Sequence, residues 1–278
     1  MGIRRGFVDV REGQIHYRSC GTSAGNTPTL VMLHASPGSA KSLEPLMQNL
    51  GRTRAVVALD TLGNGDSSAP IPEVPDIPYF AQGALQAIDG MDLQTFDLYG
   101  THTGASIAIE ISVTNPKRVR KLILDGVSVF TDAARQEMLI RHAPIMKPAE
   151  DGSHLVWSWH FVRDRFLFWP WYERTRAHRR DIEFPSAEAL HDMTLEVLKA
   201  LRTYHLSYNA AFRYRKQERL PLVAVPALIT TAVTDMLYPQ LEEAARLLPG
   251  CSKAPNQGYF TDKEAAETTA LFTAFLDK

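Results

Sequence analysis

The sequence has little that would tie the chain to a membrane, to nucleic acid or to an oxidising compartment. It holds 2 cysteines in 278 residues, too few to suggest a disulfide framework or a cysteine metal cluster. No apolar run approaches the roughly 20 residues of a membrane helix, and none follows Arg4 and Arg5 as a signal peptide requires. The 30 basic and 31 acidic side chains give a net charge of −1, without a basic excess for nucleic acid. We therefore expect a cytoplasmic protein with no nucleic-acid or membrane partner, whose oligomeric state the sequence does not indicate.

What is present is the composition of a globular protein with a sizeable core, because 45% of the residues are apolar and 22% are charged. Compact apolar runs predict strands at 7–10, 14–18, 29–33, 54–59, 95–99, 119–124 and 227–231. Amphipathic or small-residue patterns predict helices at 41–50, 103–113 and 265–276. Strands that alternate with helices predict an α/β fold with a mostly parallel, doubly wound sheet.

The alternation breaks in residues 128–220, which we call the inserted helical segment. It has a mainly helical pattern and contains all 4 tryptophans of the chain. We expect it to be a helical cap on a core formed by residues 1–127 and 221–278. The dense aromatic stretch at 157–172 is interpreted mainly as packing between cap and core, with some rings lining a pocket.

Several short segments, taken in chain order, carry one resemblance. Residues 34–39 (HASPGS) and 60–67 (DTLGNGDS) look like the H-G-x-P-G-S and D-x-x-G-x-G-x-S loops of α/β-hydrolases. Residues 100–104 (GTHTG) occupy the place of the G-x-S-x-G nucleophile elbow between a strand and a helix. The chain thus resembles a capped member of this superfamily, which implies an eight-stranded sheet flanked by helices. The resemblance also implies an oxyanion hole formed by the backbone amides of Ser36 and Thr103.

Two positions depart from the superfamily pattern. His102 stands where the elbow serine is expected, and Tyr259 stands where the resemblance places the triad histidine. Ser106 does not restore the serine, because it lies one helical turn later and lacks the flanks of a strand-to-helix turn. The sequence therefore predicts an enzyme that is not a conventional serine hydrolase.

The candidate catalytic residues are His102, Asp235 and Tyr259, with Asp125 as an alternative acid or a strand-end cap. His102 is placed for work as a general base or as a nucleophile. Asp235 follows a late strand, where the resemblance places the triad acid, and it would orient His102 or Tyr259. Tyr259 is either a hydrogen-bond donor to the substrate or a pocket filler, because an unperturbed tyrosine is a poor base at neutral pH.

These residues favour an enzyme that acts on a small carbonyl compound, such as an ester, a lactone or a keto acid. Carbon–carbon cleavage or proton transfer without a cofactor is an alternative, since neither needs a serine, and a non-catalytic ligand-binding protein is another. An anionic substrate would suit a polar residue of the cap facing the pocket, such as Arg163 or His160. We interpret His34 and Asp60 as structural parts of their loops. No spacing of histidines or cysteines suggests a metal, and we expect no cofactor.

The sequence predicts that a fluorophosphonate probe will not label this protein at the elbow, because position 102 carries no hydroxyl. Mass spectrometry of the probe-treated protein checks this. Stoichiometric labelling at Ser106 would show that the elbow has been assigned in the wrong register.

Overall fold

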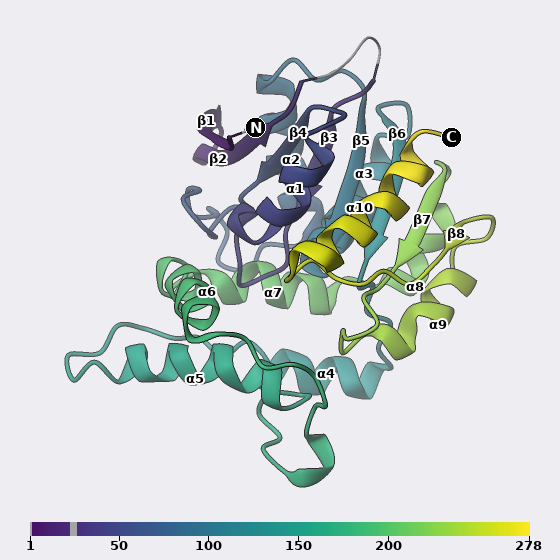
Figure 1. The fold of residues 1–278 in the computed structure, drawn as a ribbon. Coiled ribbons are helices and arrows are strands. Elements are labelled where there is room, and N and C mark those ends of the chain that lie inside the picture. The colour runs from purple at the N-terminus through teal and green to yellow at the C-terminus, as the bar shows by residue number, and fades with distance from the viewer. Residues whose placement is uncertain (1, 23–26) are drawn as a thin grey trace.

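The computed structural model describes residues 2–22 and 27–278 and centres on one twisted sheet (Figure 1). In these residues the sheet has eight strands in the order β1-β2-β4-β3-β5-β6-β7-β8. Their bounds are β1 Arg4–Val10, β2 Gly13–Cys20, β3 Leu30–Leu33, β4 Val56–Leu59, β5 Phe96–Thr101, β6 Val119–Asp125, β7 Ala227–Thr230 and β8 Ser252–Lys253. The β1–β2 and β2–β4 pairs are antiparallel, and the other neighbours are parallel. This confirms the predicted fold class; residues 1 and 23–26 of the predicted core lie outside the described residues.

Helices cover both faces of the sheet, so its central strands are buried throughout. Strand β3 shows the alternation: Val31 and Leu33 enter one apolar cluster, and Leu30 and Met32 enter the other. One face packs on α1 and α10, and the opposite face packs on α2 and α3 (Figure 1). The core helices are α1 Glu44–Leu50, α2 Ile77–Gly90, α3 Thr103–Thr114, α9 Leu241–Arg246 and α10 Asp262–Leu276, with 3₁₀ turns η1 Ala40–Leu43 and η4 Tyr238–Gln240.

The sequence patterns miss α2, α9 and the two-residue strand β8. Helix α2 starts inside a proline-rich stretch that reads as a loop, but Asp76 caps it by accepting a 2.9 Å hydrogen bond from the Tyr79 amide. Pro78 is tolerated because it lies in the first turn, where the missing N–H would have no intrahelical acceptor. The predicted helix at 41–50 divides into η1 and α1, with Pro45 in the first turn of α1.

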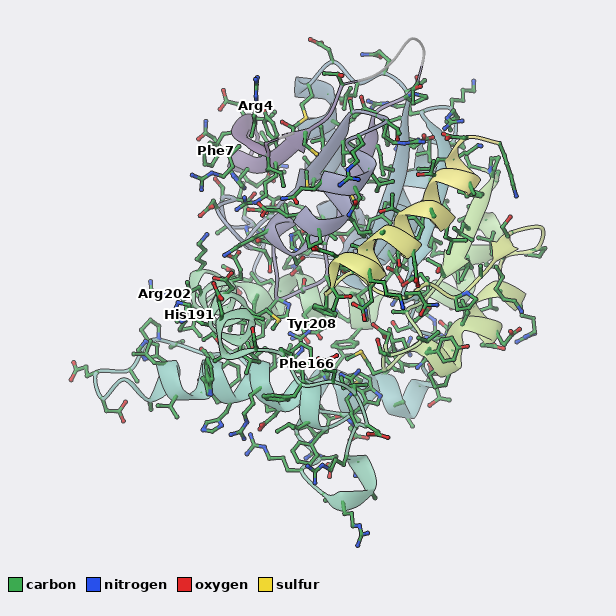
Figure 2. All side chains as sticks on the ribbon, viewed as in Figure 1. Arg4, Phe7, Phe166, His191, Arg202 and Tyr208 are labelled. Atoms are coloured by element: carbon green, nitrogen blue, oxygen red, sulfur yellow. The ribbon has the colours of Figure 1, made fainter. Side chains whose placement is uncertain are left out.

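The inserted helical segment lies across the carboxyl ends of the strands (Figure 1). Its elements are α4 Asp132–Arg141, α5 Ser153–Leu167, η2 Arg176–His178, α6 Ala187–Lys199, α7 Tyr204–Arg213, α8 Lys216–Arg219 and η3 Leu220–Leu222. In Figure 2, Phe166 and Tyr208 lie between α7 and α5, and both side chains pack against the apolar cluster of this segment. Within the described residues, no helix combines the length and apolar character needed to cross a bilayer.

The aromatic side chains of this segment pack mainly on each other. Trp157 stacks on Phe161 with ring centroids 4.9 Å apart, and Phe161 meets Trp171 edge-on at 5.0 Å. Tyr204 joins the same cluster from α7. The interpretation of the stretch as packing between cap and core therefore needs correction, because these rings give the segment an apolar core of its own.

Two glycines let α3 approach the sheet closely enough to form a sharp turn after β5. A methyl group on Gly104 would lie 2.2 Å from the carbonyl oxygen of Leu33. A methyl group on Gly100 would lie 2.3 Å from the carbonyl oxygen of Gly104. Both neighbours are backbone atoms that cannot rotate away, so these positions require glycine for close approach.

We expect Gly104→Ala to lower the free energy of unfolding by about 2 kcal/mol or more, because overpacking against backbone costs energy. Helix propensity alone would predict the opposite sign, since alanine is favoured over glycine in a helix by about 1 kcal/mol. Urea unfolding measures the difference. Gly2→Ala is the matched control, because no heavy atom lies within 4 Å of the added methyl group. Equal urea midpoints for the two variants would contradict the prediction.

Candidate active site

His102 is the residue between β5 and α3, and it has a backbone conformation that few non-glycine residues adopt. Its φ is 51° and its ψ is −106°, and its amide donates a 2.9 Å hydrogen bond to the Asp125 carbonyl oxygen. Gly126 makes room for the ring, because a methyl group there would lie 2.8 Å from His102 Nε2. The side chain remains 27% exposed, so solvent reaches it. The strained turn thus presents an imidazole at the carboxyl edge of the sheet.

Asp235 is the acid that meets His102. Its Oδ2 lies 2.9 Å from His102 Nε2, and its Oδ1 accepts a 2.7 Å hydrogen bond from the Leu237 amide. Asp235 lies in the turn after β7, so the two residues come from positions 133 apart in the chain. The structure thus brings together two of the three predicted catalytic residues and leaves Nδ1 on the opposite edge of the imidazole ring.

The charges of this dyad stabilise each other. Burial opposes protonation of His102, but the charge and hydrogen bond of Asp235 outweigh it and raise the pKa of His102 above its ordinary value. Burial likewise opposes ionisation of Asp235, but the charge of His102, its hydrogen bond and the Leu237 amide hold the pKa of Asp235 below its ordinary value. The ionised Asp235 therefore accepts a hydrogen bond from Nε2–H, and the neutral form of His102 carries its lone pair on Nδ1.

Tyr259 and Asp125 belong to a second, buried polar group beside the dyad. The Tyr99 hydroxyl donates to Asp125 Oδ2 at 2.8 Å, and Asn256 Nδ2 donates to Asp125 Oδ1 at 3.0 Å. Burial, aided by the charge of Asp235, raises the pKa of Asp125 to about 6. Burial also raises the pKa of Tyr259, whose hydroxyl interacts with Tyr99 and Thr101. Across the described residues, neither the Asp125 carboxylate nor the Tyr259 hydroxyl makes a hydrogen bond to the His102 ring.

The two residues predicted to supply the oxyanion hole lie in the loop after β3 and at the start of α3. Thr103 is the first residue of α3, so its amide has no intrahelical acceptor. Ser36 is buried in the loop after β3, and its Oγ lies 2.8 Å from Ser207 Oγ in α7. Asn64 Nδ2 donates to the same Ser207 oxygen at 3.0 Å. The loop after β3 is therefore hydrogen-bonded to the inserted helical segment through one serine.

Ser106 does not take part in this site. It is fully buried in α3, and its Oγ approaches the His102 carbonyl oxygen at 3.4 Å. No substrate could reach this hydroxyl without moving the helix.

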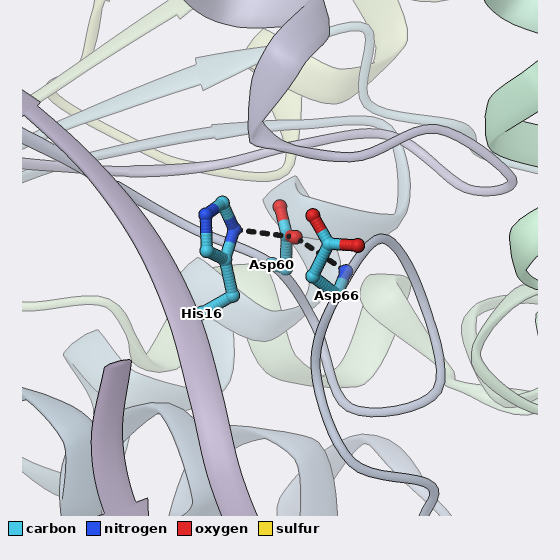
Figure 3. Close-up of side chains that lie close together, drawn as sticks. All are labelled: His16, Asp60 and Asp66. Atoms are coloured by element: carbon cyan, nitrogen blue, oxygen red, sulfur yellow. Dashed lines mark hydrogen bonds and ion pairs between the residues drawn. The ribbon is translucent and has the colours of Figure 1, made fainter. Parts of the chain in front are cut away.

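A group of three possible metal ligands, His16, Asp60 and Asp66, lies elsewhere in the core (Figure 3). Asp60 Oδ2 lies 2.8 Å from His16 Nδ1 and accepts from the Asp66 amide at 2.9 Å, while Oδ1 accepts from the Ala40 amide at 2.7 Å. The Asp66 carboxylate pairs with Lys199 at 3.1 Å. The lone pairs of these carboxylates are therefore used to hold the loop, as the structural interpretation of Asp60 expects. His34 holds the same loop, because its Nε2 accepts from the Thr61 amide at 2.9 Å.

The inserted helical segment places charged side chains near the dyad. The sequence indicated Arg163 as a residue that could face the pocket, but Arg163 is paired with the buried Asp164 at 2.7 Å. Arg165 and Arg180 were not singled out from the sequence. Arg180 donates to the Thr234 carbonyl oxygen at 2.8 Å, next to Asp235. Arg165 lies within electrostatic reach of His102. No sequence motif could have identified Arg165 and Arg180, because their positions near the dyad depend on how α5 and the loop after it fold.

The sequence matches one known protein family. Residues 28–169, about half of the chain, match the model of the α/β hydrolase fold. The chain belongs to this family.

Curated proteins resemble this chain over part of its length, and two examples are given. The chain is 28% identical over 133 residues to 2-hydroxymuconate semialdehyde hydrolase from Pseudomonas sp. (strain CF600), a match that covers 47% of this chain and 42% of that protein. It is 31% identical over 131 residues to 2-hydroxy-6-oxononadienedioate/2-hydroxy-6-oxononatrienedioate hydrolase from Paraburkholderia xenovorans (strain LB400), covering 43% of each chain. The chain thus spans less than half the length of these curated relatives.

The solved structures show the same fold over the whole chain. A crystal structure of the enol-lactonase from Burkholderia xenovorans LB400 matches with a TM-score of 0.72 and 17% identity, covering 98% of this chain and 100% of that chain. Epoxide hydrolase A from Mycobacterium thermoresistibile matches with a TM-score of 0.75 and 18% identity, covering 99% and 98%. At these identities the likeness shows the fold alone.

We expect Asp235→Asn to lower the pKa of His102, because the charge that raises it is removed while the burial that lowers it remains. The imidazole of the variant should therefore lose its proton at a lower pH than that of the wild-type protein. NMR titration of His102 measures this without any substrate. Glu150→Gln, an exposed change of the same charge, should leave the titration unaltered. An unchanged pKa in Asp235→Asn would show that the dyad does not exist in solution.

Proposed function

We propose that this chain is an enzyme that acts on a small carbonyl compound, such as an ester, a lactone or a keto acid, with His102 in place of a serine nucleophile. The observation that carries the proposal is the 2.9 Å contact between His102 Nε2 and Asp235 Oδ2 at the elbow. An imidazole that has an acid partner on one nitrogen and a free lone pair on the other is arranged for proton transfer.

In hydrolysis by general base catalysis, His102 Nδ1 takes a proton from a water molecule whose oxygen attacks the carbonyl carbon. Asp235 stabilises the imidazolium that forms, without itself taking a proton. The bond to the leaving group then breaks, and the same proton passes from Nδ1 to that group. The amides of Thr103 and Ser36 are proposed to hold the oxyanion, and each such donor contributes about 10²–10³ in rate in other enzymes.

Nucleophilic catalysis by His102 is the second route at the same residue. Nδ1 would attack the carbonyl carbon, the bond to the leaving group would break, and that group would take a proton from water, which leaves an acyl-imidazole and hydroxide. Hydroxide would then attack the acyl carbon and release the acid and neutral His102. Both routes leave Tyr259 the role of a hydrogen-bond donor or of a wall of the site, because burial raises its pKa and keeps its hydroxyl protonated. Asp125 is proposed to hold Tyr99 and Asn256 in place, since its carboxylate accepts from both.

Two curated relatives that are named as hydrolases support hydrolysis. One fold supports many chemistries, so the reaction depends on the residues of the site. Carbon–carbon cleavage or proton transfer is the second candidate, favoured by the elbow itself: His102 supplies a base but no hydroxyl. The inserted helical segment is proposed to act as a cap, because it lies over the strand ends from which the site residues project (Figure 1).

We expect His102→Ala and His102→Gln to lose about 10²–10⁴ in kcat on any substrate found in a screen of activated esters, lactones and β-keto acids, because a general base contributes that much. Glutamine keeps a hydrogen-bond donor for Asp235 but cannot take a proton. Steady-state kinetics of the purified variants measure the loss.

His191→Ala is the control, because this histidine is exposed on α6 (Figure 2) and should keep wild-type kinetics. His102→Ser alone should not create an efficient esterase, since it lacks the base that Tyr259 replaces. Full activity in His102→Ala would assign the chemistry to another residue. A wild-type protein that binds these compounds without turning any of them over would favour the non-catalytic alternative.

A further inference from the structure

His142, at the end of α4, is a histidine that the proposed chemistry does not use. It is 1% exposed and lies inside a ring of aromatic side chains from Trp169, Tyr172, Tyr208 and Phe212, all at centroid distances of 5.2–6.0 Å. Its Nε2 lies 3.1 Å from the Tyr208 hydroxyl. Its Nδ1 is buried and has no hydrogen-bond partner among the described residues.

The surroundings of His142 fix which nitrogen carries the proton. Burial, with the charges of Arg165 and His102, lowers the pKa of His142 to about 3, so the ring is neutral and has one N–H. A proton on Nδ1 would be a buried donor without an acceptor, a rare and costly arrangement. The proton therefore belongs on Nε2, which donates it to the oxygen of Tyr208.

This assignment frees the proton of the Tyr208 hydroxyl. An oxygen that accepts from His142 keeps its own O–H for another acceptor. The ring is held in place by stacking on Phe212, with centroids 5.2 Å apart and planes 14° apart. Figure 2 shows Tyr208 close to Phe166, near the carboxyl-terminal end of α5, and both side chains pack against the same apolar cluster. The positive charge of Arg165 and the negative charge of Asp235 both act on the Tyr208 hydroxyl, which therefore offers a donor at this end of α5.

Arg165 supplies a cation at the same place. Arg180 donates to the Arg165 carbonyl oxygen at 2.7 Å and to the Thr234 carbonyl oxygen at 2.8 Å, which holds this end of α5 beside Asp235. The charge of Arg165 also acts on His102, His142 and Tyr208. Its guanidinium lies over the Phe161 ring at 5.7 Å, and no carboxylate pairs with it among the described residues. The nearest acids are occupied, since Asp235 holds His102 and Asp164 holds two other arginines.

We propose that Tyr208 and Arg165 form a subsite for a carboxylate group of the substrate, and that His142 positions the Tyr208 hydroxyl for it. The subsite combines a cation, a donor with a free proton and a partly desolvated setting, which together favour a carboxylate over a neutral group. This inference rests on the proposed function, because the subsite is proposed beside the His102–Asp235 dyad. It narrows the substrate to a carbonyl compound that also bears a carboxylate.

The test uses benzoate as the probe and benzamide as its neutral counterpart, with dissociation constants measured by NMR titration of the purified full chain. Benzoate should bind the wild-type protein at least ten times more tightly than benzamide does. Arg165→Gln should weaken benzoate about tenfold or more, as expected for loss of a charged partner, and Tyr208→Phe about two- to tenfold, as expected for one neutral hydrogen bond. Arg202→Gln is the matched control, because it removes an exposed cation in the turn between α6 and α7 and should change nothing.

A second measurement tests the role of His142 directly. Nitrogen-15 spectra of histidine-labelled protein distinguish the two neutral tautomers, and loss of one set of signals in His142→Phe assigns them. The Nε2–H tautomer is expected, and His142→Phe should weaken benzoate about as much as Tyr208→Phe does. An Nδ1–H tautomer would overturn the positioning role. Equal binding of benzoate and benzamide, no binding of benzoate, or undiminished binding in Arg165→Gln would overturn the subsite.

The two proposals can fail separately. His102→Gln should still bind benzoate, because the subsite lies on the inserted helical segment. If benzoate binding depends on Arg165 and Tyr208 while His102→Gln keeps full turnover, the subsite stands and the proposed function falls. If His102→Gln abolishes turnover while Arg165→Gln binds benzoate as tightly as the wild-type protein does, the proposed function stands and the subsite falls.

Discussion

The close contact between α3 and β3 is the constraint on which the site depends. Gly104 has no side chain, so its backbone can rest against the Leu33 carbonyl, and the chain must turn sharply just before it. That turn forces His102 to a positive φ and directs its side chain away from the packed interior. The same contact sets Thr103 at the start of the helix, where its amide has no intrahelical acceptor. Packing of small residues therefore determines where the reactive group stands.

A histidine at this turn changes the electrostatics of the site. In a serine triad, the acid meets the base and the base meets the nucleophile, whereas here the acid meets the elbow residue itself at 2.9 Å. Tyr259, which the sequence motifs predict at the place of the triad histidine, belongs through its hydroxyl to a polar group with Tyr99 and Asp125. This group is uncharged when Asp125 is protonated, and the pKa of Asp125 near 6 sets where that changes. Two carboxylates beside one imidazole thus respond differently to pH because their partners differ.

The sequence predicted the fold class and most core elements, because buried parallel strands and loop motifs leave local patterns. It failed where local signals conflict with packing, as at α2, whose start lies among prolines and is revealed only by the Asp76 cap. It singled out His102 and Asp235 by their places after strands, and the structure brings their side chains together. It could not find Tyr208, Arg165 or His142, because their positions depend on how helices of the inserted segment pack over the strand ends.

The hydrogen bonds of Ser207 have a mechanical consequence. One hydroxyl in α7 connects Ser36 of the loop after β3 with Asn64 of the loop after β4. Any motion that lifts α7 from the sheet must break both contacts, and the three side chains that share them are buried. Separation of α7 from the sheet is therefore costly at this point, so α7 and the two loops should move as one unit.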